Sequence, residues 1–231
     1  MAYQIQVCTP SDAEALANNN VSAFWEDPTW RLVWTRPGHA EIPKEELIKA
    51  AGLRMRNNLA MDRDLRRHVK AVDDKGNLVG YARWLLPGEK WKDAWPEMKG
   101  PEPSEEERRE WEGMAERAAG VWMPREDMGD VDEPVVEVLG ELMGRGEYLN
   151  LDYLAVHPDH KGKGIATLLV QHGVEAAERL GLDAFVLAFE AGLGIYKRNG
   201  FKLLRQLTLN DAVYGGKGDF TRYYLERKTG M

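Results

Sequence analysis

The sequence predicts an α/β fold, and three observations carry this prediction. Residues 165–180 place apolar side chains at helical spacing, and strand-like segments at 148–156 and 184–189 flank them. A second pair of strand-like segments, 68–72 and 78–86, is joined by a glycine-containing turn typical of a hairpin. The 231 residues are 43% hydrophobic and 30% charged, which is typical of a globular protein. We therefore expect one domain that spans the whole chain.

The N-terminal half begins with an alternating strand at 4–8, followed by a helix that starts after Thr9. A hydroxyl N-cap, Pro10 at the first helical position and an acid in the first turn mark this helix, which we expect to end near Asn18. Pro43 opens a second helix with apolar residues near helical spacing. The segment between the two helices is broken by proline and glycine, so we expect a loop there.

The segment 87–134 differs in composition from the rest of the chain. It holds 15 acidic and 7 basic residues among 48, together with six of the eleven prolines. A capping-box pattern at 103–107 predicts a helix that ends near Gly120. We interpret this segment as a charged insertion or lid with few buried apolar contacts. A solvated helix with loops is the alternative, and a short helix at 135–143 is expected to follow.

The C-terminal half has the clearest pattern. The helix at 165–180 has a glycine directly after it, as a C-cap requires. The near-continuous apolar run at 184–189 is typical of a strand covered on both faces. A short helix at 191–198, ended by an Asn-Gly pair, and strands at 201–209 and 220–227 complete the chain.

Charge and cysteine content argue against several classes of protein. With 38 acidic and 31 basic residues the net charge is −7, so the chain lacks the basic character of nucleic-acid-binding proteins. No apolar run approaches the ~20 residues of a membrane span, and the N-terminus has no secretion-signal pattern. Cys8 is the single cysteine, which excludes internal disulfides and a thiolate zinc cluster. We expect a cytoplasmic monomer or homodimer without nucleic-acid, membrane or metal partners.

The turn before the helix at 165–180 is the most informative stretch. It contains Gly162 and Gly164, and glycine lets a backbone approach a ligand closely. The first N–H groups of a helix lack internal partners and carry partial positive charge, so the turn predicts a phosphate cradle. A glycine-rich helix entry without a ligand is the alternative. The Walker pattern is absent, and a Rossmann fingerprint fits weakly, with Glu190 in place of its ribose-binding acid. An NAD-type nucleotide binder therefore stays a less favoured reading.

These residues resemble the GNAT superfamily of acyl-CoA-dependent N-acyltransferases, whose signature is Arg/Gln-x-x-Gly-x-Gly/Ala at a strand–turn–helix junction. Residues 161–166, Lys-Gly-Lys-Gly-Ile-Ala, match it with lysine in the first slot. Residues 195–201, Ile-Tyr-Lys-Arg-Asn-Gly-Phe, resemble the family's second block, and 79–84 resemble its third strand. An asparagine common at the start of the short helix is replaced by Glu-Ala-Gly at 190–192. The chain looks most similar to fungal-type members with an insertion before the fourth strand.

The resemblance implies a mixed, mostly antiparallel sheet flanked by helices, splayed beside the fourth strand to admit CoA. It also implies direct transfer of an acetyl group from acetyl-CoA to a primary amine of a small molecule or protein. A CoA-binding module without catalysis is the alternative. The residues expected to bind acetyl-CoA are Leu154, Ala155, Val156, Lys161, Gly162, Lys163, Gly164, Ile165, Ala166 and Thr167.

Two residues are expected to carry the chemistry. Tyr196 matches the family's tyrosine beside the CoA sulfur, where a phenol suits protonation of a leaving thiolate. Asn150, Asp152 and Leu154 share one face of a regular strand, and Asp152 is the ionisable group among them, hence the candidate base. A structural aspartate is the alternative, and Glu190 is the reserve base. Asn150 and Glu190 are also expected near the acceptor.

All eight tryptophans precede residue 123. Trp25, Trp30 and Trp34 fall between the first two helices, in the segment that lines the acceptor pocket of the resembling family. Together with Trp84 they are expected to form an aromatic wall for an amine. Core packing is the alternative.

Overall fold

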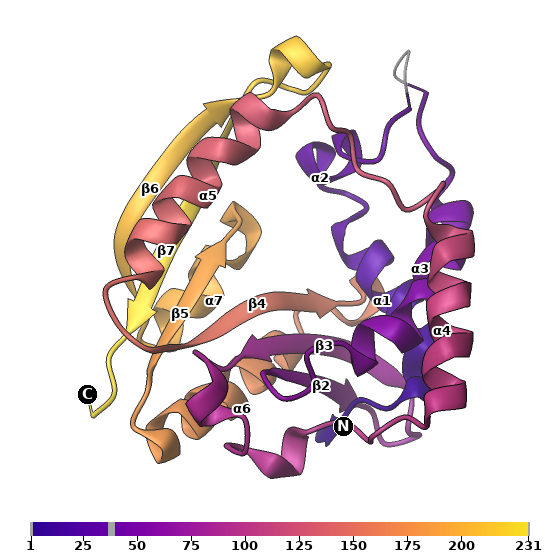
Figure 1. Cartoon of the computed structure of the whole chain (residues 1–231). Coiled ribbons are helices and arrows are strands. Elements are labelled where there is room, and N and C mark those ends of the chain that lie inside the picture. The colour runs from indigo at the N-terminus through magenta and orange to yellow at the C-terminus, as the bar shows by residue number, and fades with distance from the viewer. Residues whose placement is uncertain (1, 37–39, 231) are drawn as a thin grey trace.

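The computed structural model describes residues 2–36 and 40–230, and within them seven strands form one sheet (Figure 1). The strand order is β1-β2-β3-β4-β5-β7-β6, and only β4 and β5 run parallel. The predicted mixed, mostly antiparallel α/β sheet is confirmed. The strands are β1 Gln4–Val7, β2 Arg66–Val72, β3 Leu78–Leu85, β4 Tyr148–Val156, β5 Asp183–Ala188, β6 Lys202–Asn210 and β7 Asp219–Arg227.

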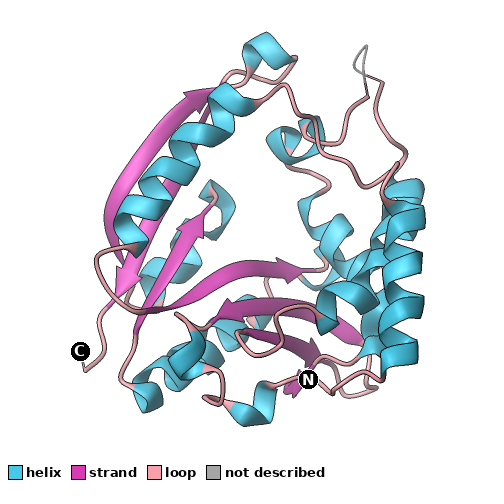
Figure 2. Cartoon of the chain, in the orientation of Figure 1, coloured by secondary structure: helices cyan, strands magenta, loops and turns pink. Residues whose placement is uncertain are grey.

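Helices flank this sheet on both faces (Figure 2). None of those in the described part of the chain is long and apolar enough to span a bilayer. The α-helices are α1 Ala13–Phe24, α2 Pro28–Leu32, α3 Lys44–Ala60, α4 Glu105–Ala118, α5 Gly129–Met143, α6 Ile165–Leu180 and α7 Glu190–Arg198. Short 3₁₀ turns include η2 Glu89–Trp91, η3 Pro96–Met98 and η5 Ala212–Tyr214.

The helices form layers because neighbouring strand residues face opposite ways. Leu149 and Leu151 of β4 pack with α6 in the largest core, on one face of the sheet. Tyr148 points the other way and packs with Leu142 of α5 and with Phe185 of β5. On that same face, α1 and α3 cover β3 and the end of β4, while α5 lies along β6 and β7 (Figure 1). α1 and α3 thus form one helical group and α5 forms the other, and the two groups lie on either side of β4.

Several boundaries differ from expectation. α1 continues to Phe24 instead of ending near Asn18, because its later turns bury Val21 against the core. The segment expected as a loop contains the five-residue helix α2. α5 begins at Gly129, so Pro134 lies inside the helix and does not precede it.

The segment 87–134, for which we keep the name insertion from the sequence-based expectation, is better packed than expected. Trp95 is 3% exposed and lies edge-on to Trp84 of β3, with ring centroids 6.5 Å apart. Trp111 of α4 and Met128 are also buried, and α4 packs against α3 (Figure 1). The expectation of few buried apolar contacts is therefore wrong, because the insertion's apolar residues pack onto the rest of the domain.

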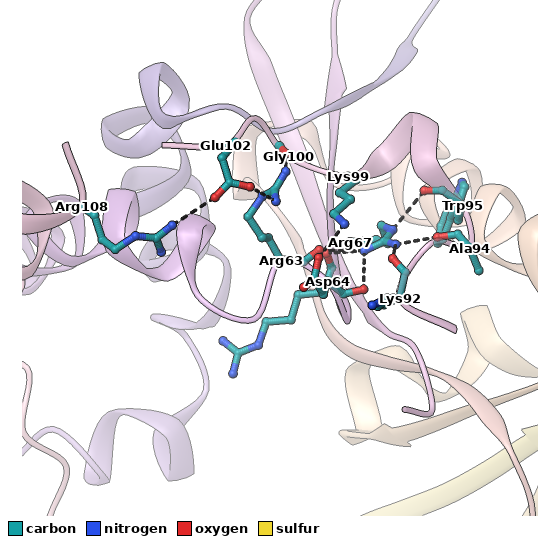
Figure 3. Close-up of polar contacts among 11 residues, drawn as sticks. Arg63, Asp64, Arg67, Lys92, Ala94, Trp95, Lys99, Gly100, Glu102 and Arg108 are labelled. Atoms are coloured by element: carbon teal, nitrogen blue, oxygen red, sulfur yellow. Dashed lines mark hydrogen bonds and ion pairs between the residues drawn. The ribbon is translucent and has the colours of Figure 1, made fainter. Parts of the chain in front are cut away.

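Arg67 of β2 connects this strand to the start of the insertion through hydrogen bonds. Its side chain is fully buried and donates to six backbone carbonyls, of which three belong to Lys92, Ala94 and Trp95 (Figure 3). The Nη2 atom lies 3.0 Å from the Lys92 oxygen, and Nε lies 3.0 Å from the Trp95 oxygen. Burial lowers the pKa of Arg67. The guanidinium thus satisfies carbonyls that would otherwise be buried without donors.

Replacing Arg67 with methionine is expected to destabilise the fold by about 3–5 kcal/mol, because several buried carbonyls lose their only charged donor. Urea unfolding followed by far-UV circular dichroism measures the change. The matched control is Arg66→Met, which removes an adjacent arginine whose ion pair with Asp62 lies near the surface. This control is expected to cost less than about 1 kcal/mol. Equal losses for the two variants would contradict the role assigned to Arg67.

Candidate active site

β4 and β5 separate half-way along their length. They pair from Tyr148 with Asp183 as far as Leu151 with Val186. Beyond this point β4 pairs only with β3, while β5 pairs with β7 up to Ala188. Within the described part of the chain, the edge of β4 that faces β5 therefore has no strand partner over 152–156. Leu154, Ala155 and Val156, which are among the residues expected to bind acetyl-CoA, lie on this open stretch.

A β-bulge coincides with the separation. Trp84 of β3 pairs with Leu151, and its neighbour Arg83 pairs with Tyr153, so Asp152 is the extra residue. As a result Leu151 and Leu154, three positions apart, both pack on the α6 side. Tyr153 faces the α1 side, against Tyr81.

The expectation that Asn150, Asp152 and Leu154 share one face is therefore wrong, because the bulge interrupts the alternation of side chains. Asn150 is half-buried and pairs with Phe185 of β5 just before the separation. Only one further pair, Leu151 with Val186, joins the two strands after it.

Asp152 forms an ion pair with Arg83. The Arg83 Nε atom donates to Oδ2 of Asp152 across 2.5 Å, and the guanidinium lies over the ring of Tyr153, 5.7 Å from its centroid. The Asp152 side chain is 31% exposed. The carboxylate thus has a charged partner and also reaches solvent where β4 leaves β5. This geometry is compatible both with a role as general base and with a purely structural role for Asp152.

The turn before α6 presents a row of free backbone donors. Gly162 and Gly164 have φ of +77° and +81°, the left-handed conformation that glycine adopts without strain. Gly164 is the N-cap of α6. No other described residue accepts a hydrogen bond from the N–H groups of 162–167. Lys161 and Lys163 are exposed beside them, and Lys161 pairs with Glu26 across 3.1 Å. The residues present therefore fit a bound diphosphate.

The start of α6 lies close to the sheet because β3 has a glycine beneath it. A Cβ atom at Gly80 would lie 2.7 Å from Ile165, the first residue of the helix. Further along α6, a Cβ atom at Gly173 would lie 2.0 Å from the ring of Trp84. Trp84 is fully buried. It therefore belongs to the core on the α6 side and has no surface for an acceptor, contrary to our expectation.

Tyr196 lies on α7 under Gly192. A Cβ atom at Gly192 would lie 2.9 Å from its ring, which meets Phe201 edge-on with centroids 5.8 Å apart. The residue is 5% exposed, and burial raises the pKa of Tyr196. Its hydroxyl makes no hydrogen bond to another described residue. Glu190, the reserve base, is exposed at the first position of α7.

Aromatic side chains meet across the separation of β4 and β5. Phe24 at the end of α1 contacts Tyr153 of β4, with centroids 5.2 Å apart, and Phe189 after β5, at 6.0 Å. Trp30 stacks on Phe24 at 5.8 Å. The guanidinium of Arg222 in β7 lies 3.9 Å from the centroid of Phe189, and burial lowers its pKa. These rings form an aromatic floor between the two helical groups.

The remaining tryptophans of the expected wall lie further out. Trp34 is mostly buried, and its ring centroid is 4.3 Å from that of Trp122 of the insertion. Trp25 is half-buried, with the guanidinium of Arg31 5.8 Å from its centroid. Of the four tryptophans, Trp30 thus belongs to the aromatic floor, and Trp34 contacts Trp30 with ring centroids 5.6 Å apart.

Two hydrogen bonds connect the elements on either side of the aromatic floor. We call these elements the two walls: α2 and the insertion form one, and the connection between β6 and β7 forms the other. Thr29 of α2 donates to Oδ2 of Asp211, before η5, across 3.0 Å. Arg125 of the insertion donates to the carbonyl oxygen of Tyr214 in η5 across 2.8 Å. The connection between β6 and β7 is therefore tied both to α2 and to the insertion.

A family model described as the acetyltransferase (GNAT) family matches residues 25–201. This match covers most of the chain, including the open stretch of β4, the donor row and α7. The chain belongs to the GNAT acetyltransferase family. Acyl transfer from acetyl-CoA is thus its general chemistry.

Solved GNAT structures share the fold. A Corynebacterium glutamicum protein described as histone acetyltransferase HPA2 and related acetyltransferase aligns over 100% of this chain and 98% of its own, with a TM-score of 0.60 and 17% identity. Arylalkylamine N-acetyltransferase 2 from Aedes aegypti aligns over 99% of both chains, with a TM-score of 0.57 and 14% identity. A Drosophila melanogaster polyamine N-acetyltransferase covers 98% of this chain and 100% of its own, with a TM-score of 0.54 and 15% identity.

Sequence reasoning about this GNAT domain missed Phe24, Phe189, Tyr153 and Arg222. Phe24 lay beyond the expected end of its helix, and Phe189 was taken as an ordinary end of a buried strand. Only the convergence of α1, β4, β5 and β7 in space brings the four together. Phe189 did carry a signal in the sequence. A large apolar residue directly after a buried strand lies at the strand end, where it can contact a ligand.

Proposed function

We propose that this protein transfers an acetyl group from acetyl-CoA to a primary amine of a small molecule. The observation that carries the proposal is the row of unpaired N–H groups at 162–167, next to the stretch of β4 that has no partner strand. Leu154, Ala155 and Val156 would hold the pantetheine arm, and the donor row would hold the diphosphate. Acetyl-CoA would supply the acetyl group as a thioester, activated for attack by an amine.

Two residues are proposed to move protons. Asp152, at the bulge, would accept the proton that the acceptor ammonium or amine loses. Tyr196 would donate a proton or a hydrogen bond to the departing sulfur. Burial raises the pKa of Tyr196, so the phenol stays protonated at neutral pH and remains a donor. The acetyl carbon thus leaves sulfur for nitrogen. An acceptor that arrives as an ammonium loses one proton before the attack and a second during it. One proton is supplied to the thiolate, and one is released to solvent for each turnover.

The contacts that join the two walls favour a small acceptor over a protein. Thr29 and Arg125 link α2 and the insertion to the connection between β6 and β7. An extended polypeptide lying across the aromatic floor would have to break both contacts. The likeness to fungal-type members and a cytoplasmic location stay predictions.

Release of free CoA in the presence of an amine panel tests the proposal. Turnover with at least one amine is the expected result. Acetyl-CoA that stabilises the protein against heat, with no CoA release from any amine, would instead support a binding module without catalysis. A thermal shift with NAD and none with acetyl-CoA would point to the nucleotide-binding alternative.

Tyr196→Phe is expected to lower kcat by ~10–10³-fold, because the substitution removes the donor to the leaving sulfur and keeps the ring. The melting temperature is expected to change little, since the hydroxyl has no described partner. Stopped assays of acetylated product measure kcat. Tyr148→Phe is the matched control, because it removes a buried tyrosine's hydroxyl that donates to Glu226 across 3.2 Å, away from α7. Normal turnover with lowered stability in Tyr196→Phe would assign this residue to packing.

A further inference from the structure

A small pocket opens on the α1 side of the sheet, next to the bulge in β4. It lies between α1, α3, β3 and β4 and has a cavity volume of about 60 Å³. We call it the α1–α3 pocket, and its polar and aromatic lining comprises Asn20, Arg54, Asn58, Tyr81, Arg83, Trp122 and Tyr153. Two of these residues connect it to the proposed reaction centre: Arg83 is the partner of Asp152, and Tyr153 follows Asp152 in β4. A ligand group in this pocket would therefore lie beside the acceptor.

Arg54 is a cation without a counter-charge. Arg83 pairs with Asp152, and Arg56 on the same helix as Arg54 lies 3.8 Å from Glu14. Within the described residues, Arg54 has no acidic partner and donates no hydrogen bond. Its guanidinium carbon lies 5.2 Å from the ring centroid of Trp122. A ring face does not satisfy the five N–H donors of a guanidinium.

The surroundings make this cation costly unless an anion joins it. Burial lowers the pKa of Arg54, and apolar residues of α1 and α3 form the rest of the wall: Val21, Ala51 and Met55. Both charged side chains that line the pocket are arginines. The pocket therefore repels an ammonium group and favours a negatively charged one.

Two amide side chains add neutral donors. Asn20 is 6% exposed. Its Oδ1 accepts from Nδ2 of Asn19 across 3.0 Å, while its own Nδ2 has no partner among the described residues. Asn58 lines the pocket as well, and its side chain makes no hydrogen bond within the described chain. The Tyr81 hydroxyl, by contrast, is already engaged by Nδ1 of His68 at 2.7 Å.

The size and the donor set match a carboxylate. A volume of about 60 Å³ holds a few water molecules, which is the scale of one carboxylate and too little for a large anion. A planar guanidinium fork with nearby amide N–H groups binds a carboxylate through paired, charge-assisted hydrogen bonds. We propose that the α1–α3 pocket binds a carboxylate of the acceptor, so that the substrates are amino acids rather than simple amines. This inference rests on the proposed function of acetyl transfer to a small amine.

Matched pairs of acceptors that differ only by a carboxylate test the inference. Suitable pairs are tryptophan and tryptamine, tyrosine and tyramine, ornithine and putrescine, and lysine and cadaverine. For the pair that the enzyme acetylates best, the expected kcat/KM is about 10–100-fold higher for the amino acid, the range for charge-assisted hydrogen bonds to one arginine. An equal or higher kcat/KM for the decarboxylated amine would overturn the inference. Absence of turnover with every member of the panel would instead contradict the proposed function itself.

Arg54→Met is expected to lower kcat/KM for the amino acid about 10–100-fold, mainly through KM, and to leave turnover of the decarboxylated partner unchanged. Arg56→Met is the matched control, two residues along α3 with its side chain outside the pocket, and is expected to change neither value. An equal loss for both members of the pair in Arg54→Met would assign Arg54 to structure.

Inhibition of the unmodified protein provides a second test, which does not depend on whether Arg54→Met folds. Indole-3-propionate, which carries the carboxylate of tryptophan without its amine, is expected to inhibit competitively against the acceptor. Indole-3-propanol, in which a hydroxymethyl group replaces the carboxylate, is the control and is expected to inhibit at least about tenfold more weakly. Equal inhibition by the acid and the alcohol would overturn the inference.

Discussion

Gly164→Glu is expected to weaken acetyl-CoA binding by at least about 100-fold. The new carboxylate would lie at the N-cap of α6 beside the donor row, where it would repel the diphosphate and compete for the same N–H groups. Isothermal titration calorimetry with acetyl-CoA measures the affinity. The proposal that the donor row holds the diphosphate predicts this loss irrespective of which amine is the acceptor.

The matched control for this variant is Gly181→Glu. Gly181 caps the opposite end of the same helix with φ of +69°, close to the +81° of Gly164, and nothing lies within 4 Å of a Cβ at either position. Both variants therefore carry similar backbone strain, about 1–2 kcal/mol, and similar losses of melting temperature. Only Gly164→Glu is expected to lose acetyl-CoA. An affinity near that of the unmodified protein would contradict the phosphate cradle.

Asp152→Asn is expected to lower kcat by ~10²–10⁴-fold with little change in acetyl-CoA affinity, because the amide cannot accept the proton from the amine. Steady-state kinetics measure kcat, and isothermal titration calorimetry measures the affinity for acetyl-CoA.

Glu147→Gln provides a comparison that separates chemistry from ion pairing. Glu147 precedes β4 and forms its own ion pair with Lys90 across 2.7 Å, so this variant also removes a carboxylate paired with a cation next to the same strand. It is expected to leave kcat unchanged. If Asp152→Asn lowers stability but keeps the kcat of the unmodified protein, then Asp152 serves only to pair with Arg83, and Glu190 becomes the base to test.

The elements with strong local signals were predictable. The helix at 165–180 was predicted with the bounds that α6 has, because its apolar period and the following glycine both act within a few residues. The strand at 148–156 likewise matches β4. The bulge at Asp152 was not predictable, because one extra residue in a strand is defined by its partner strand. The assumed alternation across Asn150 and Leu154 therefore failed.

Contacts between residues far apart in the sequence were the other feature that could not be predicted. The charge density of the insertion suggested a solvated segment, yet Trp95 packs against Trp84. The carbonyls of Lys92, Ala94 and Trp95 also accept hydrogen bonds from Arg67. A sequence pattern does not show which buried surface an aromatic residue will meet. For the same reason Trp84, expected beside the acceptor, lies in the core, whereas Phe24 and Phe189 meet across the sheet.

The hydrogen bonds of Arg125 have a consequence for how ligand binding and local stability are linked. One arginine in the insertion reaches the Thr35 hydroxyl after α2 and the Tyr214 carbonyl before β7. Any opening that separates these walls also releases residue 125, so amide hydrogens nearby exchange through the same fluctuation. An acceptor held between the walls lowers the population of the open form by mass action. Slower hydrogen exchange near residue 125 would then report occupancy of a site that the residue does not touch.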